Sequence, residues 1–295
     1  MSLTKMLSKR ELPLRQFFES RLPNCAYMQK EWKSCGKPVI IPEGQVNWGF
    51  VGAAFDYRVR YLFTITPPDR FNAARGSIQL PDNHFLFQEF ATDLTNFLSL
   101  NDPRGRALSP ATERQLASYC YVLAIYESLF RARVQSSPLF NLPIGATVAD
   151  LLALAPTADI DDLYNLINAA AHTLENLFSK PIIANPTFTG SIDVGGADAD
   201  LIIENCLLEI KTTKNTSLDK EMVYQLLGYV LLDYDDEYRI GEIGFYLSRV
   251  PALIKFPLES AIEIMSNGAY DIISLRREIR ELLFNLSHDP MEPYG

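Results

Sequence analysis

Four charged side chains interrupt an apolar, strand-like passage of the sequence, "ADADLIIENCLLEIKTTKN". They are Asp198, Asp200, Glu209 and Lys211. Because side chains alternate across a strand, Glu209 and Lys211 share one face of "CLLEIKTT", and Asp198 and Asp200 share a face of the preceding strand. If the two strands are hairpin neighbours with their turn at "EN", the four groups converge at one end of a sheet.

Carboxylates gathered in this way need a cation as a partner. Cross-strand contacts bring side chains within about 5 Å of each other. Like charges at that distance repel, and an unpaired buried carboxylate is unfavourable. Magnesium prefers hard oxygen ligands, keeps several waters and accepts phosphate oxygens. The pattern therefore indicates phosphodiester chemistry, in which Lys211 orients a water or stabilises the pentacovalent state.

Two motifs resemble those of a known nuclease superfamily. Asp200 and, on the next strand, Glu209-x-Lys211 resemble the core motif of the PD-(D/E)XK nucleases, with Ala199 where those families often have proline. The helix that follows carries "YQLLGYVLL", in which Gln225 and Tyr229 lie one turn apart. This resembles the Gln-x-x-x-Tyr motif of the RecB-like branch, whose glutamine reaches the active site.

The resemblance implies a catalytic set and a metal site. The expected catalytic residues are Asp200, Glu209, Lys211, Gln225 and Tyr229. Asp200 and Glu209 are expected to hold Mg²⁺ or Mn²⁺, with the carbonyl of Ile210 as a possible third ligand. Asp198 is the alternative to Asp200.

A fainter resemblance lies near the N-terminus. "SRLPNCAYMQKEW" and "WGFVGAAFDYRVRYLF" are similar to the RecB-type opening, in which a Gly-x-x-x-His helix brings histidine to the metal. Here Gly52 is followed by Asp56 instead. Asp56 is a candidate metal ligand, or it pairs with Arg58 or Arg60. No iron–sulfur cluster is expected, because that variant needs three further cysteines near the C-terminus and none follows Cys206.

Composition sets limits on the class of protein. The chain has 295 residues, 47% of them hydrophobic and 21% charged, the profile of a globular protein. It shows no apolar signal segment and no stretch of about 20 apolar residues, so a cytoplasmic location without membrane insertion is expected. Its four cysteines are too dispersed for a zinc or redox motif and are expected to be buried thiols. The scattered histidines show no metal spacing, and His172 and Glu175 are only secondary site candidates.

Charge is distributed unevenly along the chain. Net charge is −9, but residues 1–80 carry twelve Lys or Arg against six acidic residues. Either this region has a solvated basic surface, or it forms a basic track for a polyanion. On the second view, Arg58, Arg60, Lys214 and Arg249 contact nucleic acid near Asp200, while the acidic runs "ADIDD" and "DYDDE" face away.

Hydrophobic periodicity predicts the elements that position these residues. Residues 11–63 show short helical signals, 64–106 look loop-rich, and helices are expected near 110–133, 147–155 and 157–179. Three strands forming an antiparallel meander, a helix capped by Ser217 or Asp219, two strands and a C-terminal helix follow. The fold class is α/β (α+β), with a central mixed sheet flanked by helices and a restriction-endonuclease-like core in residues 157–295. Residues 1–156 form a mainly helical elaboration, part of which resembles an insertion that shapes the substrate channel.

The predicted function is that of a metal-dependent nuclease acting on DNA, in repair, recombination or phage defence, and the resemblance implies possible helicase or other repair or defence partners. One alternative is a catalytically silent nuclease-fold module that binds nucleic acid or assembles with partners. Another is an unrelated α/β enzyme with a coincidental carboxylate cluster, for which the strands at 190–211 are not adjacent. RNA as substrate, cleavage at ends or internal sites, sequence specificity and oligomeric state stay open.

Overall fold

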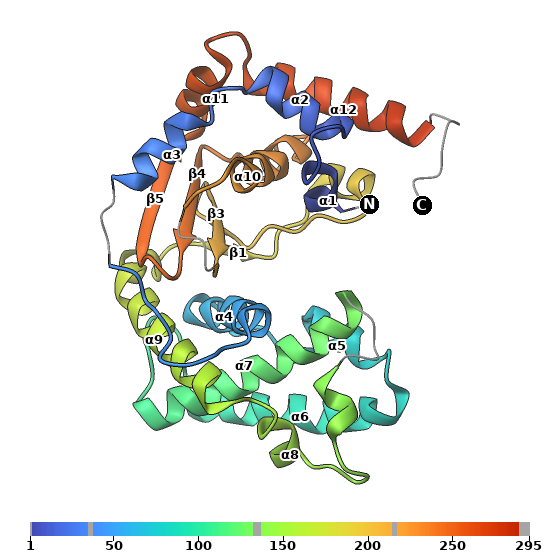
Figure 1. The fold of residues 1–295 in the computed structure, drawn as a ribbon, viewed down its shortest axis with the longest axis vertical. Helices are drawn as coiled ribbons and strands as arrows, with labels where there is room; N and C mark the ends of the chain where they lie inside the picture. The colour runs from blue at the N-terminus through green and yellow to red at the C-terminus, as the bar shows by residue number, and fades with distance from the viewer. Residues whose placement is uncertain (1, 35–37, 132–136, 214–216, 289–295) are drawn as a thin grey trace.

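The protein has an α+β architecture in which a five-stranded mixed sheet lies between two groups of helices (Figure 1). The computed structural model describes residues 2–34, 38–131, 137–213 and 217–288, to which all structural statements here refer. The predicted mixed sheet with helices on its faces is confirmed. Within these ranges, no helix is long and apolar enough to cross a membrane.

The sheet follows the order of the strands along the chain. The strands are β1 (Ile182–Ala184), β2 (Leu201–Ile203), β3 (Cys206–Lys211), β4 (Glu242–Leu247) and β5 (Ala252–Pro257). β1, β2 and β3 form the predicted antiparallel meander. β3 and β4 are parallel, and β5 returns antiparallel to β4. Parallel neighbours need a crossover connection, and helix α10 lies between β3 and β4 in the chain.

One face of the sheet packs against both ends of the chain. Ile202, Leu207 and Phe245 point into a core that the helices on this side complete. These helices are α1 (Leu3–Leu7), α2 (Pro13–Arg21), α3 (Ala26–Lys33), α10 (Lys220–Leu232), α11 (Leu258–Ser266) and α12 (Ile272–His288). Most of α10 from Val223 onward is apolar and buried, because α1 and α12 cover the sides that the sheet does not.

The opposite face packs against the middle of the chain. Leu201, Leu208 and Ile210 belong to this second core, as alternation along the strands requires. Its helices are α4 (Trp48–Phe63), α5 (Asn72–Ser77), α6 (Pro81–Leu100), α7 (Pro110–Arg131), α8 (Val148–Leu152) and α9 (Thr157–Thr173). α4 lies nearest the sheet and α7 packs behind it (Figure 1).

The predicted helix starts are largely confirmed. Asp219 caps α10 by accepting a hydrogen bond from the backbone N–H of Met222. Thr147 opens α8 in a capping box with Asp150. Ser109 accepts the first backbone hydrogen bond of α7, from Glu113, through its carbonyl. Side-chain oxygens near the first turn satisfy N–H groups that have no partner inside the helix.

Several sequence predictions need correction. The loop-rich reading of residues 64–106 is wrong, because residues 81–100 form the twenty-residue helix α6, with a proline in the first turn, where its ring starts a helix rather than breaking it. α11 was not predicted. The division of the chain at residue 156 stays a prediction; in the packing, α1–α3 complete the core around α10, and α9 packs on α4 and α7.

Three of the four cysteines lie in the described ranges, and all three are buried free thiols, as predicted. The fourth, Cys35, lies outside those ranges.

Candidate active site

The hairpin of β2 and β3 brings two carboxylates together. Leu201 pairs with Leu208, so Asp200, just before β2, comes beside Glu209 on β3. Asp200 Oδ2 accepts a hydrogen bond of 2.7 Å from the backbone N–H of Ile210. That bond fixes Oδ2 of Asp200, while Oδ1 takes no part in it. The strands around 190–211 are therefore adjacent, contrary to what the coincidental-cluster alternative expects.

A chain of polar contacts leads from Glu209 into helix α10. Lys211 Nζ lies 2.6 Å from Glu209 Oε1 and donates a second hydrogen bond of 3.0 Å to Gln225 Oε1. The Gln225 amide in turn donates to the Tyr229 hydroxyl at 2.7 Å. Gln225 and Tyr229 are one turn apart on α10, so they lie on the same face of this helix, and that face contacts Lys211 through Gln225. The structure thus joins five residues that the sequence motifs predicted as one site.

Helix α4 contributes Asp56 and Arg60, one turn apart on one face. α4 approaches the end of β3 closely: a Cβ on Gly52 would lie 3.6 Å from the carbonyl oxygen of Thr212. Arg60 Nη2 lies 3.9 Å from Asp200 Oδ1. The Asp56 side chain makes no hydrogen bond or ion pair within the described ranges, so an ion pair with Arg58 or Arg60 is absent there.

Burial makes the acidic groups of this site reluctant to ionise. Burial and the nearby Asp200 charge raise the pKa of Glu209 to about 7. Burial also raises the pKa of Asp200, and burial with the Asp200 charge raises that of Asp56 well above its usual range. For Lys211, burial acts to lower the pKa, but the charges of Glu209 and Asp200 outweigh it and the pKa is raised. Lys211 therefore stays protonated, and the surrounding carboxyl groups outnumber the positive charges that could compensate them.

The donor set fits a divalent cation held by few protein ligands. Glu209 Oε2 is buried and has no hydrogen-bond partner in the described part of the chain. Such an atom is costly unless a ligand satisfies it. Among these residues, no group of three or more His, Cys, Asp or Glu side chains is arranged as a ready-made metal cage. A magnesium ion that keeps several waters needs only one or two carboxylates, and Asp200 and Glu209 meet that requirement.

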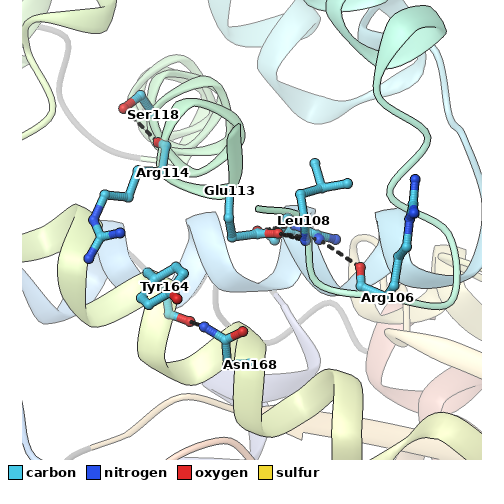
Figure 2. A network of polar contacts seen from close by, with 8 residues as sticks. Arg106, Leu108, Glu113, Arg114, Ser118, Tyr164 and Asn168 are labelled. Carbon is cyan, nitrogen blue, oxygen red and sulfur yellow. Dashed lines mark hydrogen bonds and ion pairs between the residues drawn. The ribbon is translucent and has the colours of Figure 1, made fainter. Parts of the chain in front are cut away.

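Arg58 does not fit its predicted role in nucleic-acid binding. Its side chain is fully buried, and its guanidinium donates to both carboxylate oxygens of Glu113 at 2.6 and 2.9 Å. Glu113 also accepts from the backbone N–H of Leu108, and Figure 2 shows it reaching from α7 toward the loop that carries Leu108 and Arg106. Arg58 therefore joins α4 to α7 inside the core.

Arg249 does not fit that role either. It is buried and forms two hydrogen bonds of 2.5 Å with Asp162. Asp162 belongs to the run "ADIDD", so this run does not simply face solvent: Asp159 is also buried and accepts from the Tyr121 hydroxyl. In "DYDDE", Asp233 is likewise fully buried. Intramolecular partners explain these charges.

The remaining predicted residues fall outside the cluster. Asp198 is exposed, and it is Asp200 rather than Asp198 that lies beside Glu209. His172 and Glu175 form an exposed pair, 3.8 Å apart. Lys214 lies outside the described residues.

A cavity that none of the site residues lines was not predicted from the sequence. A space of about 310 Å³ lies between α4 and α7, lined in part by Gly49, Ala53, Ala124 and Ser128. The cavity forms because both helices carry small side chains at i and i+4, which do not fill the space between them. That spacing is visible in the sequence, but small residues at helical intervals also serve close packing, so only the structure distinguishes the two.

No family model, no curated protein and no solved structure matches this chain.

Proposed function

We propose that this protein is a metal-dependent nuclease that hydrolyses phosphodiester bonds in DNA. The observation that carries the proposal is the continuous contact chain Glu209–Lys211–Gln225–Tyr229 beside Asp200, with a buried and unpartnered oxygen on Glu209. An ordinary surface salt bridge between Glu209 and Lys211 would not explain why a Glu209 oxygen is buried without a partner, nor why a second carboxylate, Asp200, lies beside it. The restriction-endonuclease-like identity of the core is part of this proposal.

Asp200 and Glu209 are the residues that would hold Mg²⁺ or Mn²⁺. Asp200 Oδ1 and Glu209 Oε2 are the oxygens not committed to hydrogen bonds. The Ile210 carbonyl and Asp56 are further candidate ligands. When bound, the ion would lower the pKa of a coordinated water and neutralise charge developing on the phosphate.

Lys211 is the residue we expect to act on the attacking water. Its ammonium has three donors, two of which are directed at Glu209 Oε1 and Gln225 Oε1. The third is available to orient a water or to stabilise an oxyanion. Gln225 holds Lys211 in place, and Tyr229 fixes which end of the Gln225 amide faces the lysine.

DNA is the proposed substrate on the basis of the motif resemblance alone, together with roles in repair, recombination or phage defence and with partner proteins in those processes. The second candidate is a catalytically silent nuclease-fold module. The intact set Asp200, Glu209 and Lys211 favours catalysis over this second candidate, and the metal-binding measurement below separates the two.

The test is cleavage of circular and linear DNA, single- and double-stranded, with Mg²⁺, Mn²⁺ or EDTA. Asp200→Asn and Lys211→Met should each lower the rate by about 10²-fold or more, the range seen when a transition-state donor or base is removed. The control is Asp193→Asn, which alters an exposed aspartate that accepts from the Tyr234 hydroxyl. It should cleave as the wild type does.

Unchanged cleavage by both site variants would contradict the proposal. DNA binding without cleavage, and without Mg²⁺ or Mn²⁺ binding in calorimetry, would favour the silent module.

A further inference from the structure

Arg60 is a largely buried charge whose guanidinium makes no hydrogen bond to any of the described residues. Its side chain is 12% exposed, and Nη2 lies 3.9 Å from Asp200 Oδ1, beyond hydrogen-bond range. Its Nε is buried with no partner in the described part of the chain. The guanidinium carbon lies 5.6 Å from the centre of the Tyr57 ring. In the described part of the chain, Arg60 is thus attracted at long range by Asp200 and by Asp56, and its guanidinium lies over a ring face.

Other buried arginines of this protein are held differently. Arg58 donates to both oxygens of Glu113, Arg249 to both oxygens of Asp162, and Arg276 to Asp236 at 2.8 Å. These bonds fix the position of each guanidinium. Arg60 has five donors and no such bond, which is unfavourable for a buried group unless a ligand supplies the acceptors.

The position of Arg60 sets it in competition with a metal ion. Both the guanidinium and a divalent cation compensate Asp200, and two positive charges a few ångströms apart repel each other. A phosphate oxygen beside the ion would give Arg60 a new acceptor, since the planar guanidinium matches phosphate geometry. Metal and phosphate would then each favour the binding of the other.

We propose that Arg60 is an exchangeable counter-ion, which compensates Asp200 in the metal-free protein and turns to a phosphodiester oxygen of the substrate when the metal binds. This inference rests on the proposed function. It gives Arg60 a positioning role and predicts that metal and nucleic acid bind cooperatively, with Arg60 carrying part of the coupling.

The experiment measures Mn²⁺ affinity by titration calorimetry, with and without a single-stranded oligonucleotide whose linkages resist hydrolysis. Without DNA, Arg60→Gln should bind Mn²⁺ about tenfold more tightly than the wild type, because the competing charge is gone. Adding the oligonucleotide should tighten Mn²⁺ binding about tenfold in the wild type and markedly less in Arg60→Gln. Arg60→Lys keeps the charge and should retain the wild-type Mn²⁺ affinity.

The matched control is Arg114→Gln. Arg114 also combines an ion pair, 2.7 Å from Asp161, with a ring contact, 4.2 Å from the centre of Tyr164, and both Arg114 and Tyr164 are visible in Figure 2. A general effect of losing such contacts would appear in both glutamine variants, whereas an exchange at the metal site appears only in Arg60→Gln.

The outcomes separate this inference from the proposed function. Mn²⁺ binding that is lost in Asp200→Asn but unchanged or weaker in Arg60→Gln overturns the role of Arg60 and leaves the nuclease site standing. No Mn²⁺ binding by the wild type, with or without DNA, overturns both. Thermal unfolding of each variant verifies that it is folded.

Discussion

At the scale of single residues, the candidate site is short of positive charge. Three carboxyl groups, Asp56, Asp200 and Glu209, face Lys211 and Arg60 in a partly buried space, and the pKa of each carboxyl is raised. In the metal-free protein, ionising all three carboxyl groups is therefore electrostatically unfavourable, and protonation of one of them reduces the repulsion. A divalent cation reduces the same repulsion, so protons and metal compete for these oxygens.

That competition predicts how stability depends on pH. Glu209 has its pKa raised from 4.5 to about 7. The folded state thus binds more protons than the unfolded state between these values, and the contribution to stability is full below pH 4.5 and lost as pH rises to about 7. The difference amounts to about 3 kcal/mol at most. In EDTA, the melting temperature of wild type relative to Glu209→Gln should fall across this interval.

With saturating Mg²⁺ the trend should reverse, because the deprotonated carboxyls bind the ion. If the two proteins show parallel melting curves from pH 4.5 to 7.5 in EDTA, Glu209 does not carry the predicted shift.

At the scale of elements, α4 has two tasks. One face presents Asp56 and Arg60 to the sheet, and another buries Arg58 against α7. Because Glu113 binds Arg58 and the backbone N–H of Leu108 together, it fixes α4, α7 and the loop between α6 and α7 relative to each other. The orientation of α4, and hence of its site residues, depends on this buried pair.

Glu113→Gln should therefore destabilise the fold strongly. It leaves the fully buried Arg58 without an opposite charge, which typically costs about 3–5 kcal/mol. Replacing both residues together, Arg58→Met with Glu113→Leu, should recover much of that loss because no buried charge is left. Chemical denaturation measures both.

The control is Glu175→Gln, which affects an exposed pair with His172 and should change stability by less than about 1 kcal/mol. A loss in Glu113→Gln no larger than in this control would show that the pair does not hold α4 in place.

At the scale of the whole molecule, both ends of the chain build one core. α1 and α2 from the N-terminal part cover α10 together with α12 from the C-terminal part (Figure 1). Phe18 of α2 stacks on Tyr224 of α10 with ring centres 5.1 Å apart. The middle of the chain covers the other face of the sheet. The site lies at the end of strand β3, where α4 from one helix layer and α10 from the other both reach the sheet.

Residues 157–295 alone should consequently fail to fold, although they contain the whole sheet. Without residues 2–34 the outer side of α10 loses its apolar cover, and without α4 and α7 the opposite sheet face is exposed. The fragment should aggregate and show no cooperative thermal transition by circular dichroism, while the full chain shows one. A monomeric fragment with a sharp transition would contradict this account.

The sequence alone determined the local features, because these depend on near neighbours in the chain. Alternation placed Glu209 and Lys211 on one face of β3, and helical spacing placed Gln225 and Tyr229 on one face of α10. Side-chain chemistry limited the cap of α10 to Ser217 or Asp219, of which the structure shows Asp219. The hairpin between β2 and β3 followed from its turn. These short-range rules sufficed to assemble most of the candidate site.

Only the tertiary structure decided which charges are free and which are held. Arg58, Arg60 and Arg249 are alike as sequence letters, yet two are locked to Glu113 and Asp162, whose positions in the chain are far away, and one is left beside Asp200. Side-chain burial and ion pairing depend on contacts between distant segments, which no local pattern encodes. For the same reason the sequence could not show that residues 2–34 complete the core around α10.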